Sequence, residues 1–402
     1  MLQMECNSML PSLISHNEDL QRIQNEGISF DVRSGNLVAD CVPYLNSKKE
    51  VKAGILVFSL NTENITIKKP NDHTAFFIGE KPCEMDGTPI HGLGILEMHK
   101  PLFDNMVSDY RFSCYPDKGM YPNYYEKMIN YWRIITAPAD NFDHPACSAL
   151  KKPNLIKPLD SKLVYWDVNS SRANIAGLTD KFKGLKVAII GLGGTGSYIL
   201  DFIAKLPLDE IHLFDSDVFK QHNAFRAPGA ASIEDLEKRM SKVDYLYEKY
   251  KHMNLALIPH NEDITPANKD MLLNMDFIFL CIDNANVRNE IANYLVNNNK
   301  TFINSGIGVT LQEDKLAGLI RISMAEPGHY ELLNDAFGGH ESNDENDLYR
   351  ENIQIAELNA FAAVESVMRW KQAMGFYQDV EHIYDCDYII NKNKIIHNDS
   401  HV

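Results

Sequence analysis

Short apolar runs alternate with amphipathic segments between residues 170 and 378. The runs have the length of buried strands, and the segments between them carry apolar residues at helical spacing. Strands that alternate with helices predict an α/β domain with a doubly wound, Rossmann-like and mainly parallel sheet. The expected strands are 187–190, 211–214, 255–259, 276–282, 301–304 and 316–323, and the expected helices are 197–204, 232–251, 269–274, 286–298 and 354–374.

Residues 1–165 have a different pattern, which predicts a smaller α+β domain in front of the first. Strand-like pieces are separated by turn residues such as Ser34-Gly35-Asn36. We expect strands at 28–32, 36–39, 53–59 and 74–77, helices at 17–26 and 124–135, a proline-broken linker at 151–167 and a C-terminal tail at 379–402 with one strand-like run at 388–390.

A glycine cluster follows the apolar run 187–190. The cluster consists of Gly191, Gly193, Gly194 and Gly196. A helical segment follows it, and then comes the apolar run 211–214, which is followed by Asp215. Strand, glycine turn, helix, strand and acid in this order are typical of a nucleotide-binding βαβ unit. Glycine lets phosphate approach backbone N–H groups, and the helix N-terminus behind it favours anions.

Polar residues farther along favour ATP over a dinucleotide. Asn223 and Arg226 follow Asp215, Lys242 comes next, and Asp283 ends the run 276–282. Arginine and lysine neutralise a triphosphate, and a carboxylate can bind Mg²⁺. For single residues simpler roles stay open: Asn223 or Asp283 as a helix cap, and Arg226 and Lys242 as surface charges.

Composition narrows the classes of partner. The chain has 402 residues and a formal net charge of −16, which argues against nucleic acid and anionic membranes as partners. No apolar run approaches the roughly 20 residues that span a bilayer. The N-terminus has no signal-peptide pattern, and the seven cysteines are scattered without CxxC pairs, so we expect a cytoplasmic protein with no zinc.

The ordered set GLGGTG, DSD with Asn223 and Arg226, SKVD, and CIDNANVRN resembles the ThiF-like and ubiquitin-activating adenylyltransferase superfamily. The resemblance covers about residues 170–375. The region before 165 looks like a domain of unknown function that precedes such a module in some bacterial ThiF-like proteins.

The resemblance implies an ATP-dependent enzyme that adenylates the C-terminal carboxylate of a ubiquitin-like protein ending in glycine, as the first step of a conjugation or sulfur-carrier pathway. A conjugating enzyme would be a further partner. The implied roles are Asp215 on the ribose, the four glycines as the nucleotide loop, and Asp283 on Mg²⁺. The residues facing the triphosphate would be Asn223, Arg226 and Lys242. Arg172 resembles an arginine that a partner subunit inserts into the site, which implies a homodimer.

This sequence departs from the superfamily in its cysteines. Thioester-forming members place a cysteine after the strand that corresponds to 316–323, and this chain has none between Cys281 and Cys386. We therefore expect no catalytic cysteine: the adenylate is handed on directly, or it is passed to a hydroxyl such as Ser342, near His340, or Tyr349 in the acidic segment 331–350, which we expect to be mobile.

Other functions stay open at this stage. Within the superfamily, the substrate could be a peptide or small carboxylate. From a different class, the protein could be a non-catalytic scaffold that binds a ubiquitin-like protein. A nicotinamide oxidoreductase is the most distant alternative.

Overall fold

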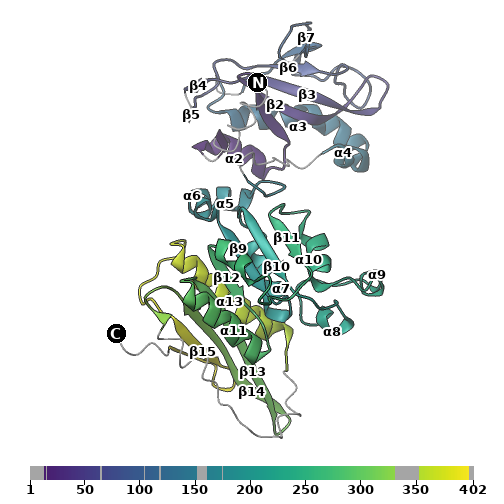
Figure 1. Cartoon of the computed structure of the whole chain (residues 1–402). Helices are drawn as coiled ribbons and strands as arrows, with labels where there is room; N and C mark the ends of the chain where they lie inside the picture. Colours follow the sequence, from purple (N-terminus) through teal and green to yellow (C-terminus); the bar gives the residue numbers. More distant parts are fainter. Residues whose placement is uncertain are drawn as a thin grey trace. The chain divides into compact units, whose positions relative to one another are not determined.

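The computed structural model describes residues 13–14, 16–63, 66–103, 105–116, 119–151, 161–173, 175–330 and 353–397, with only the backbone at 171–172. The chain forms two compact units (Figure 1). The first comprises Met1–Leu159 and Tyr165–Ala176, and the second Asp160–Val164 and Gly177–Val402.

The first unit is built on a six-stranded antiparallel sheet in the order β1-β2-β3-β6-β8-β7. The long helix α3 packs on this sheet through a core that includes Phe58, Phe77 and Tyr131. The elements are α2 (Glu18–Asn25), β1 (Phe30–Arg33), β2 (Asn36–Leu45), β3 (Val51–Ser59), β4 (Thr62–Glu63), β5 (Thr66–Ile67), β6 (Thr74–Ile78), β7 (Gly94–Glu97), β8 (Tyr110–Ser113), α3 (Tyr124–Phe142), α4 (His144–Leu150) and α5 (Val168–Arg172).

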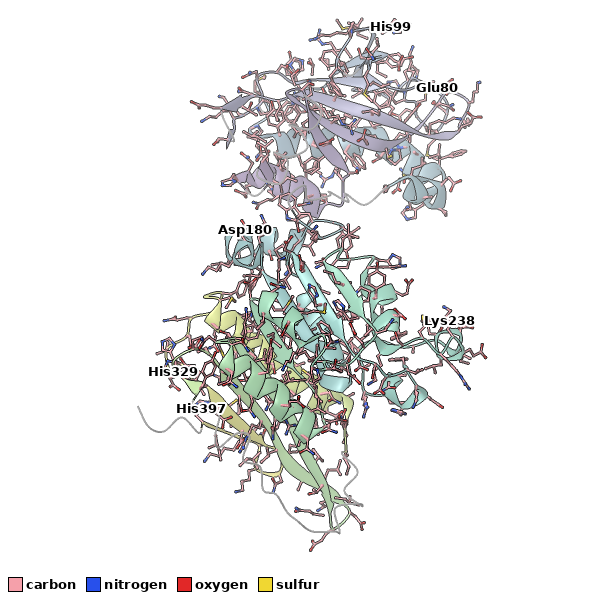
Figure 2. The ribbon with its side chains drawn as sticks, viewed as in Figure 1. Glu80, His99, Asp180, Lys238, His329 and His397 are labelled. Atoms are coloured by element: carbon pink, nitrogen blue, oxygen red, sulfur yellow. The ribbon has the colours of Figure 1, made fainter. Side chains whose placement is uncertain are left out.

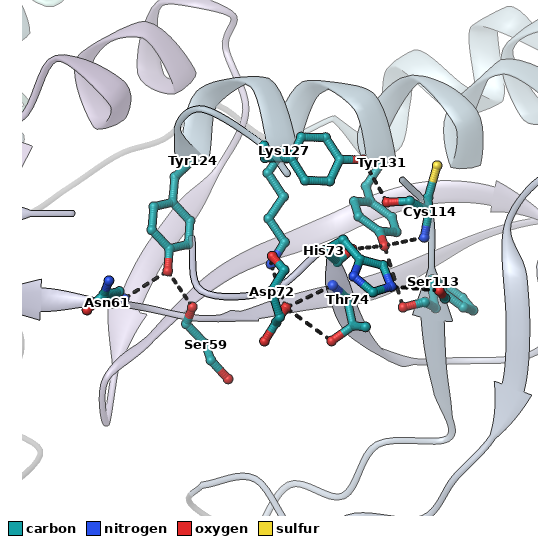
Figure 3. A network of polar contacts seen from close by, with 12 residues as sticks. Ser59, Asn61, Asp72, His73, Thr74, Ser113, Cys114, Tyr124, Lys127 and Tyr131 are labelled. Atoms are coloured by element: carbon teal, nitrogen blue, oxygen red, sulfur yellow. Dashed lines mark hydrogen bonds and ion pairs between the residues drawn. The ribbon is translucent and has the colours of Figure 1, made fainter. Parts of the chain in front are cut away.

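A buried polar network ties α3 to the sheet of the first unit (Figure 3). Lys127 of α3 is 1% exposed, and its Nζ donates to the carbonyl oxygen of Asp72 at 2.9 Å and to the Asp72 carboxylate at 3.0 Å. Tyr124 donates to the Ser59 carbonyl at 2.6 Å, and Tyr131 accepts from the backbone N–H of Cys114 at 2.8 Å. Burying a lysine requires such a paired partner, so this network fixes the position of α3.

The second unit contains an eight-stranded sheet in the order β11-β10-β9-β12-β13-β14-β15-β16. The five strands from β11 to β13 are parallel, and the other three are antiparallel, so the expected doubly wound fold is confirmed. The strands are β9 (Lys186–Ile190), β10 (Glu210–Phe214), β11 (Leu257–His260), β12 (Phe277–Leu280), β13 (Phe302–Gln312), β14 (Lys315–Ala325), β15 (Asp385–Ile389) and β16 (Lys394–His397).

Helices cover both faces of this sheet because residues alternate along the buried strands. Val187 and Ile189 of β9 pack in a core with α7, α10 and α13, whereas Ala188 and Ile190 pack in a second core with η2 and α11. The helical segments are α6 (Ala176–Thr179), η1 (Asp180–Phe182), α7 (Gly194–Ile203), α8 (Gln221–Ala224), α9 (Ile233–Glu237), α10 (Lys242–Tyr250), η2 (Lys269–Asn274), α11 (Ala285–Asn297), α13 (Ala356–Ala373) and η5 (Ile390–Lys392).

The structure differs from the sequence predictions in both units, and the first unit has additional strands β4, β5, β7 and β8 and the helix α4. The single helix expected at 232–251 is broken into α9 and α10, because Arg239 adopts a left-handed φ of 49° and the Ser241 side chain caps α10. Residues expected as a C-terminal tail contribute β15 and β16 to the sheet. Side chains of both units are drawn in Figure 2, where Lys238 of the α9–α10 connection points outward. No helix among the described residues is long and apolar enough to cross a membrane.

Candidate functional site

A cavity of about 910 Å³ opens at the carboxyl ends of β9, β10 and β12 and beside β13 in the second unit. The chain leaves β9 and β12 toward opposite faces of the sheet, and in open α/β sheets ligands bind in the crevice at such a switch point. Residues from the loops after these strands line the cavity. The topology therefore brings together segments far apart in the sequence.

The glycine turn after β9 borders the cavity with Gly191, Gly193 and Gly194. Gly191 has a φ of +90°, and a Cβ there would lie against the carbonyl group of Cys281. A Cβ on Gly196 would overlap the carbonyl oxygen of Gly191, so Gly196 supports the turn from behind and does not line the cavity. Gly193 has no neighbour within 4 Å of such a Cβ, which leaves the backbone N–H groups at the start of α7 accessible to an anion.

Asp215 directly follows β10 and is held in a fixed orientation. Its Oδ2 accepts from the backbone N–H of Leu192 at 2.7 Å, and its Oδ1 accepts from the N–H of Asp217 at 2.9 Å. Only 8% of the residue is exposed. These bonds link the acid to the glycine turn.

Lys242, the first residue of α10, is buried against the same carboxylate. Its Nζ lies 3.2 Å from Oδ2 of Asp215 and 2.7 Å from Oδ2 of Asp217. The Lys242 ammonium holds the pKa of Asp217 below its usual value of 3.8. Without a ligand, the lysine expected on the triphosphate is thus paired with two carboxylates.

Several buried polar atoms at the cavity have no hydrogen-bond partner among the described residues. They are Nε of Arg226, Nε of Arg288, Oδ1 of Asn304 and Oε1 of Gln354. Burial lowers the pKa of Arg288 although Asp283 opposes that shift. Leaving such groups unpaired costs free energy, so these residues carry unused hydrogen-bonding capacity beside the cavity.

Asp283 lies on the cavity wall, and it does not cap the next helix. That cap is Asn284, whose Oδ1 accepts from the backbone N–H groups of Asn286 at 3.1 Å and Val287 at 3.2 Å. The exposed carboxylate of Asp283 is therefore not used as the cap of α11. One carboxylate beside phosphate oxygens is a common way to bind Mg²⁺.

Asn223 and Arg172 are placed differently from the other expected site residues. Asn223 is buried, its Oδ1 accepts from the N–H of Lys220 at 2.8 Å at the start of α8, and it is not among the residues that line the cavity. Arg172 ends α5 in the first unit, and its side chain lies outside the described part of the chain.

The two cysteines considered for catalysis are poor nucleophiles in this structure. Cys281 follows β12 and borders the cavity, and burial raises the pKa of its thiol to about 12. Cys386 lies within β15 and in the core of the second unit, although its sequence position suggested a place beyond the fold core, and burial raises the pKa of its thiol to about 12. Ser342, His340 and Tyr349 lie outside the described residues.

Sequence reasoning missed several residues of the cavity wall. Asp217 is in the DSD motif, Asp263 follows β11, and Asn304 lies where β13 passes the cavity. Asp263 and Asn304 lie near the ends of expected strands, and Asp217 lies two residues after Asp215. These positions were the signal that could have identified the three residues from the sequence. Gln354 had no such signal, because α13 brings it to the site from far along the chain.

Fold and cavity together define a doubly wound α/β module with a cavity at the carboxyl ends of its parallel strands. Residues 169–347 match the ThiF family, so this part of the chain is a ThiF-family domain. Residues 18–167 match a domain of unknown function, DUF6791.

Among known proteins, the chain is similar to ubiquitin-like modifier-activating enzyme 5. It is 23% identical to the Drosophila mojavensis protein over 232 residues, which cover 53% of this chain and 55% of that protein. It is 24% identical to the Caenorhabditis elegans protein over 174 residues, 39% of this chain and 38% of that protein. The matched part of the chain thus spans about half the length of the Drosophila mojavensis protein and less of the Caenorhabditis elegans protein. Among solved structures, Escherichia coli MccB matches with a TM-score of 0.47 and 18% identity, covering 76% of this chain and 92% of that chain.

Proposed function

We propose that the second unit binds ATP and uses it to adenylate the C-terminal carboxylate of a ubiquitin-like protein. The observation that carries the proposal is the convergence of the glycine turn, Asp215, Lys242, Arg226 and Asp283 on one cavity. The similarity to ubiquitin-like modifier-activating enzymes supports this class of substrate.

In the proposed reaction, a carboxylate oxygen attacks the α-phosphorus of ATP. A bond forms between that oxygen and the phosphorus, the bond from the α-phosphorus to the bridging oxygen breaks, and pyrophosphate leaves. Asp215 would accept from the ribose, and the N–H groups of the glycine turn would face phosphate. Arg226 and Lys242 would neutralise the charge that develops on the phosphate oxygens.

Nucleotide entry would also change the pairing of Lys242. Its ammonium is 2.7 Å from the exposed carboxylate of Asp217, a contact that a phosphate oxygen can replace. Asp217 therefore acts as a placeholder that keeps the buried ammonium paired before ATP binds.

Asp283 fits the role of a magnesium ligand. The described residues contain no group of three or more His, Cys, Asp or Glu that could hold a metal alone. Mg²⁺ on a nucleotide needs fewer, since it keeps several waters and binds one or two carboxylates plus phosphate oxygens. When bound, the ion would screen phosphate charge.

The remaining partners follow from the same proposal. A homodimer would complete each site with Arg172 in trans, and a conjugating enzyme would receive the adenylated protein. The raised pKa values of Cys281 and Cys386 support transfer without a thioester on this chain. The net charge of −16 favours neither nucleic acid nor membrane as a partner, and we propose a cytoplasmic location.

Pyrophosphate exchange into ATP tests the proposal. The purified protein would be assayed with a ubiquitin-like protein ending in glycine and with the same protein lacking that glycine. Exchange that requires the glycine is the expected result.

The other outcomes separate the alternatives. Exchange with a short peptide but not with the ubiquitin-like protein would indicate a peptide adenylyltransferase. Binding of the ubiquitin-like protein with no ATP binding would indicate a scaffold.

A further inference from the structure

Two histidines on neighbouring strands of the second unit are joined by a hydrogen bond. His212 of β10 is 8% exposed, and its Nδ1 lies 2.9 Å from Nε2 of His260, the last residue of β11. The other ring nitrogen of His212, Nε2, lies 2.8 Å from Oε2 of Glu210. None of these three residues lines the cavity, so the proposed adenylation leaves this cluster without a role.

The hydrogen bonds determine which ring nitrogens carry protons. Glu210 is ionised at neutral pH, because hydrogen bonds from His212 and Lys186 hold its pKa below the usual value. An ionised carboxylate only accepts, so Nε2 of His212 carries a proton and donates it. In the neutral pair, Nδ1 of His212 is then the acceptor, and Nε2 of His260 must be the donor.

The facing nitrogens also limit how many protons the pair can take up. One added proton preserves the hydrogen bond, since a cationic histidine can donate to a neutral one whichever ring carries the charge. A second added proton places N–H groups on both facing nitrogens, and two cations then meet across a distance of 2.9 Å. Burial and the neighbouring His212 already lower the pKa of His260, although Glu262 opposes that shift. Acid therefore breaks the contact between the two rings.

Charged residues from several segments surround the pair. They are Lys186 of β9, Asp209 and Glu210 at the start of β10, Asp244 of α10, Glu262 after β11, Lys269 and Asp270 of η2, and Asp276 before β12. Several of them have partners of their own. Asp244 accepts from the Asn261 side chain at 3.0 Å, and Asp270 accepts from the Tyr294 hydroxyl at 2.6 Å. The Lys269 ammonium lies 4.5 Å from the centre of the Tyr294 ring. The two glutamates are therefore the carboxylates that act on the histidine rings.

The pair is connected to the cavity through Phe214. The rings of His260 and Phe214 stack with their centroids 4.3 Å apart and an interplanar angle of 6°, and Phe214 lines the cavity. The carbonyl oxygen of His260 also accepts from the backbone N–H of Asp215 at 3.4 Å. A displacement of His260 therefore reaches both the cavity wall and the acid that follows β10.

We propose that His212 and His260 form a pH-sensitive switch, in which the neutral or singly protonated pair joins β10 to β11 and the doubly protonated pair releases the cavity wall. In the unfolded chain both histidines take up protons near pH 6.5, whereas the folded pair resists the second proton. The stabilisation is therefore fully present above about pH 6.5 and is lost as the pH falls below that value. A ligand that requires the intact wall should bind more weakly in acid. This effect on ATP rests on the proposed function, whereas the switch itself does not.

Urea unfolding of the full chain between pH 7.5 and 5.5 tests the switch. Trp370 reports on the second unit once Trp132 and Trp166 are replaced by phenylalanine. His260→Gln is the informative variant, because its amide N–H can still donate to His212 and does not titrate. Over this range the unfolding constant of the unmodified second unit should rise about fivefold more than that of His260→Gln. His252→Gln, at an exposed position after α10, should keep the full pH dependence.

An equal pH dependence in the unmodified protein and in His260→Gln overturns the proposal. Nitrogen-15 NMR of the unmodified protein with labelled histidines decides the matter if the variant does not fold. We expect one ring protonated only on Nε2 at neutral pH and a single proton taken up by the pair above pH 5.5. Two histidines that titrate independently near pH 6.5 would overturn the switch.

Calorimetric titration with ATP–Mg²⁺ at pH 7.5 and 5.5 tests the connection to the cavity. The affinity should fall more in the unmodified protein than in His260→Gln, and comparing the two proteins removes the titration of the nucleotide itself. An equal fall in both refutes the connection to the cavity. No ATP binding at either pH refutes the proposed function, and the unfolding and NMR measurements then decide on the switch alone.

Discussion

Replacing Lys242 with methionine should destabilise the second unit by leaving a buried carboxylate without its cation. Asp215 is 8% exposed, and the Lys242 ammonium lies 3.2 Å from its Oδ2. Removing one partner of a buried pair costs about 3–5 kcal/mol. Asp215 keeps two backbone N–H donors, so we expect the lower end, a loss of about 3 kcal/mol in the free energy of unfolding.

Urea unfolding followed by tryptophan fluorescence measures this loss. Trp370 is buried in the core of the second unit, whereas Trp132 and Trp166 pack in the first. Phenylalanine at the latter two positions makes the signal specific to the second unit. With a urea slope of about 3 kcal/mol per molar, the unfolding midpoint should fall by about 1 M.

The same substitution in an Asp215→Asn background is the matched control. No buried anion remains there, so Lys242→Met should cost about 1 kcal/mol, a coupling of roughly 2 kcal/mol between the two residues. An equal loss in both backgrounds, or a loss below about 1 kcal/mol in the original protein, would refute the reasoning.

Other substitutions test separate features. Asp283→Ala should abolish magnesium-dependent pyrophosphate exchange and leave the melting temperature unchanged; near-normal exchange in this variant contradicts the metal assignment. Asn284→Ala should instead lower the free energy of unfolding by about 1 kcal/mol through loss of the helix cap, while the Asp283 carboxylate stays in place. Gly196→Ala should eliminate ATP binding, measured by calorimetry, because its Cβ overlaps the first carbonyl of the glycine turn; retained affinity contradicts that geometry. In the first unit, Asp72→Ala should destabilise by about 3 kcal/mol, because the buried ammonium of Lys127 loses its carboxylate and keeps only its hydrogen bond to the carbonyl oxygen of residue 72. Lys127→Met should cost under about 2 kcal/mol because Asp72 is half exposed; equal losses in chemical unfolding would refute this asymmetry. Burial alone would raise the pKa of Asp72, but the contacts with Lys127 hold that pKa below 3.8. The stabilisation from these contacts should therefore be fully present above pH 3.8 and disappear as the pH falls through the folded-state pKa of Asp72. Unfolding curves of Lys127→Met should lack that pH dependence.

The glycine turn could be predicted because few other local structures fit its sequence. An apolar run, a glycine cluster and a second apolar run ending on an acid are local in sequence, and the structure places Asp215 and Asp283 just after buried strands. Asn223 shows the limit of this reasoning. Its side-chain amide could contact a phosphate or accept a hydrogen bond at the start of α8. The sequence fits both roles, and the hydrogen bond from Lys220 identifies the second one in the structure.

The strand β15 was predicted only in part, since the expected run 388–390 overlaps its end, and the missed part has a physical explanation. Its polar residues are buried: Asp385 accepts from the Ser323 hydroxyl at 2.5 Å, and Asp387 binds the Arg321 guanidinium through two contacts of 2.7 Å. Polar residues in this segment predicted a solvent-exposed tail, but in the structure their side chains pair with residues of β14. Such pairing across a sheet cannot be derived from hydrophobic pattern alone.

The contact between α7 and α13 has a consequence for synthesis of the protein on the ribosome. Asn359 of α13 accepts from the Thr195 hydroxyl at 3.1 Å, across 164 positions of sequence, and its side chain fills the space beside Gly194. A nascent chain that has emerged only as far as β14 therefore holds every glycine of the turn but lacks the side chain that packs against it. The proposed nucleotide site should therefore be completed late in translation, when α13 leaves the exit tunnel and docks on α7.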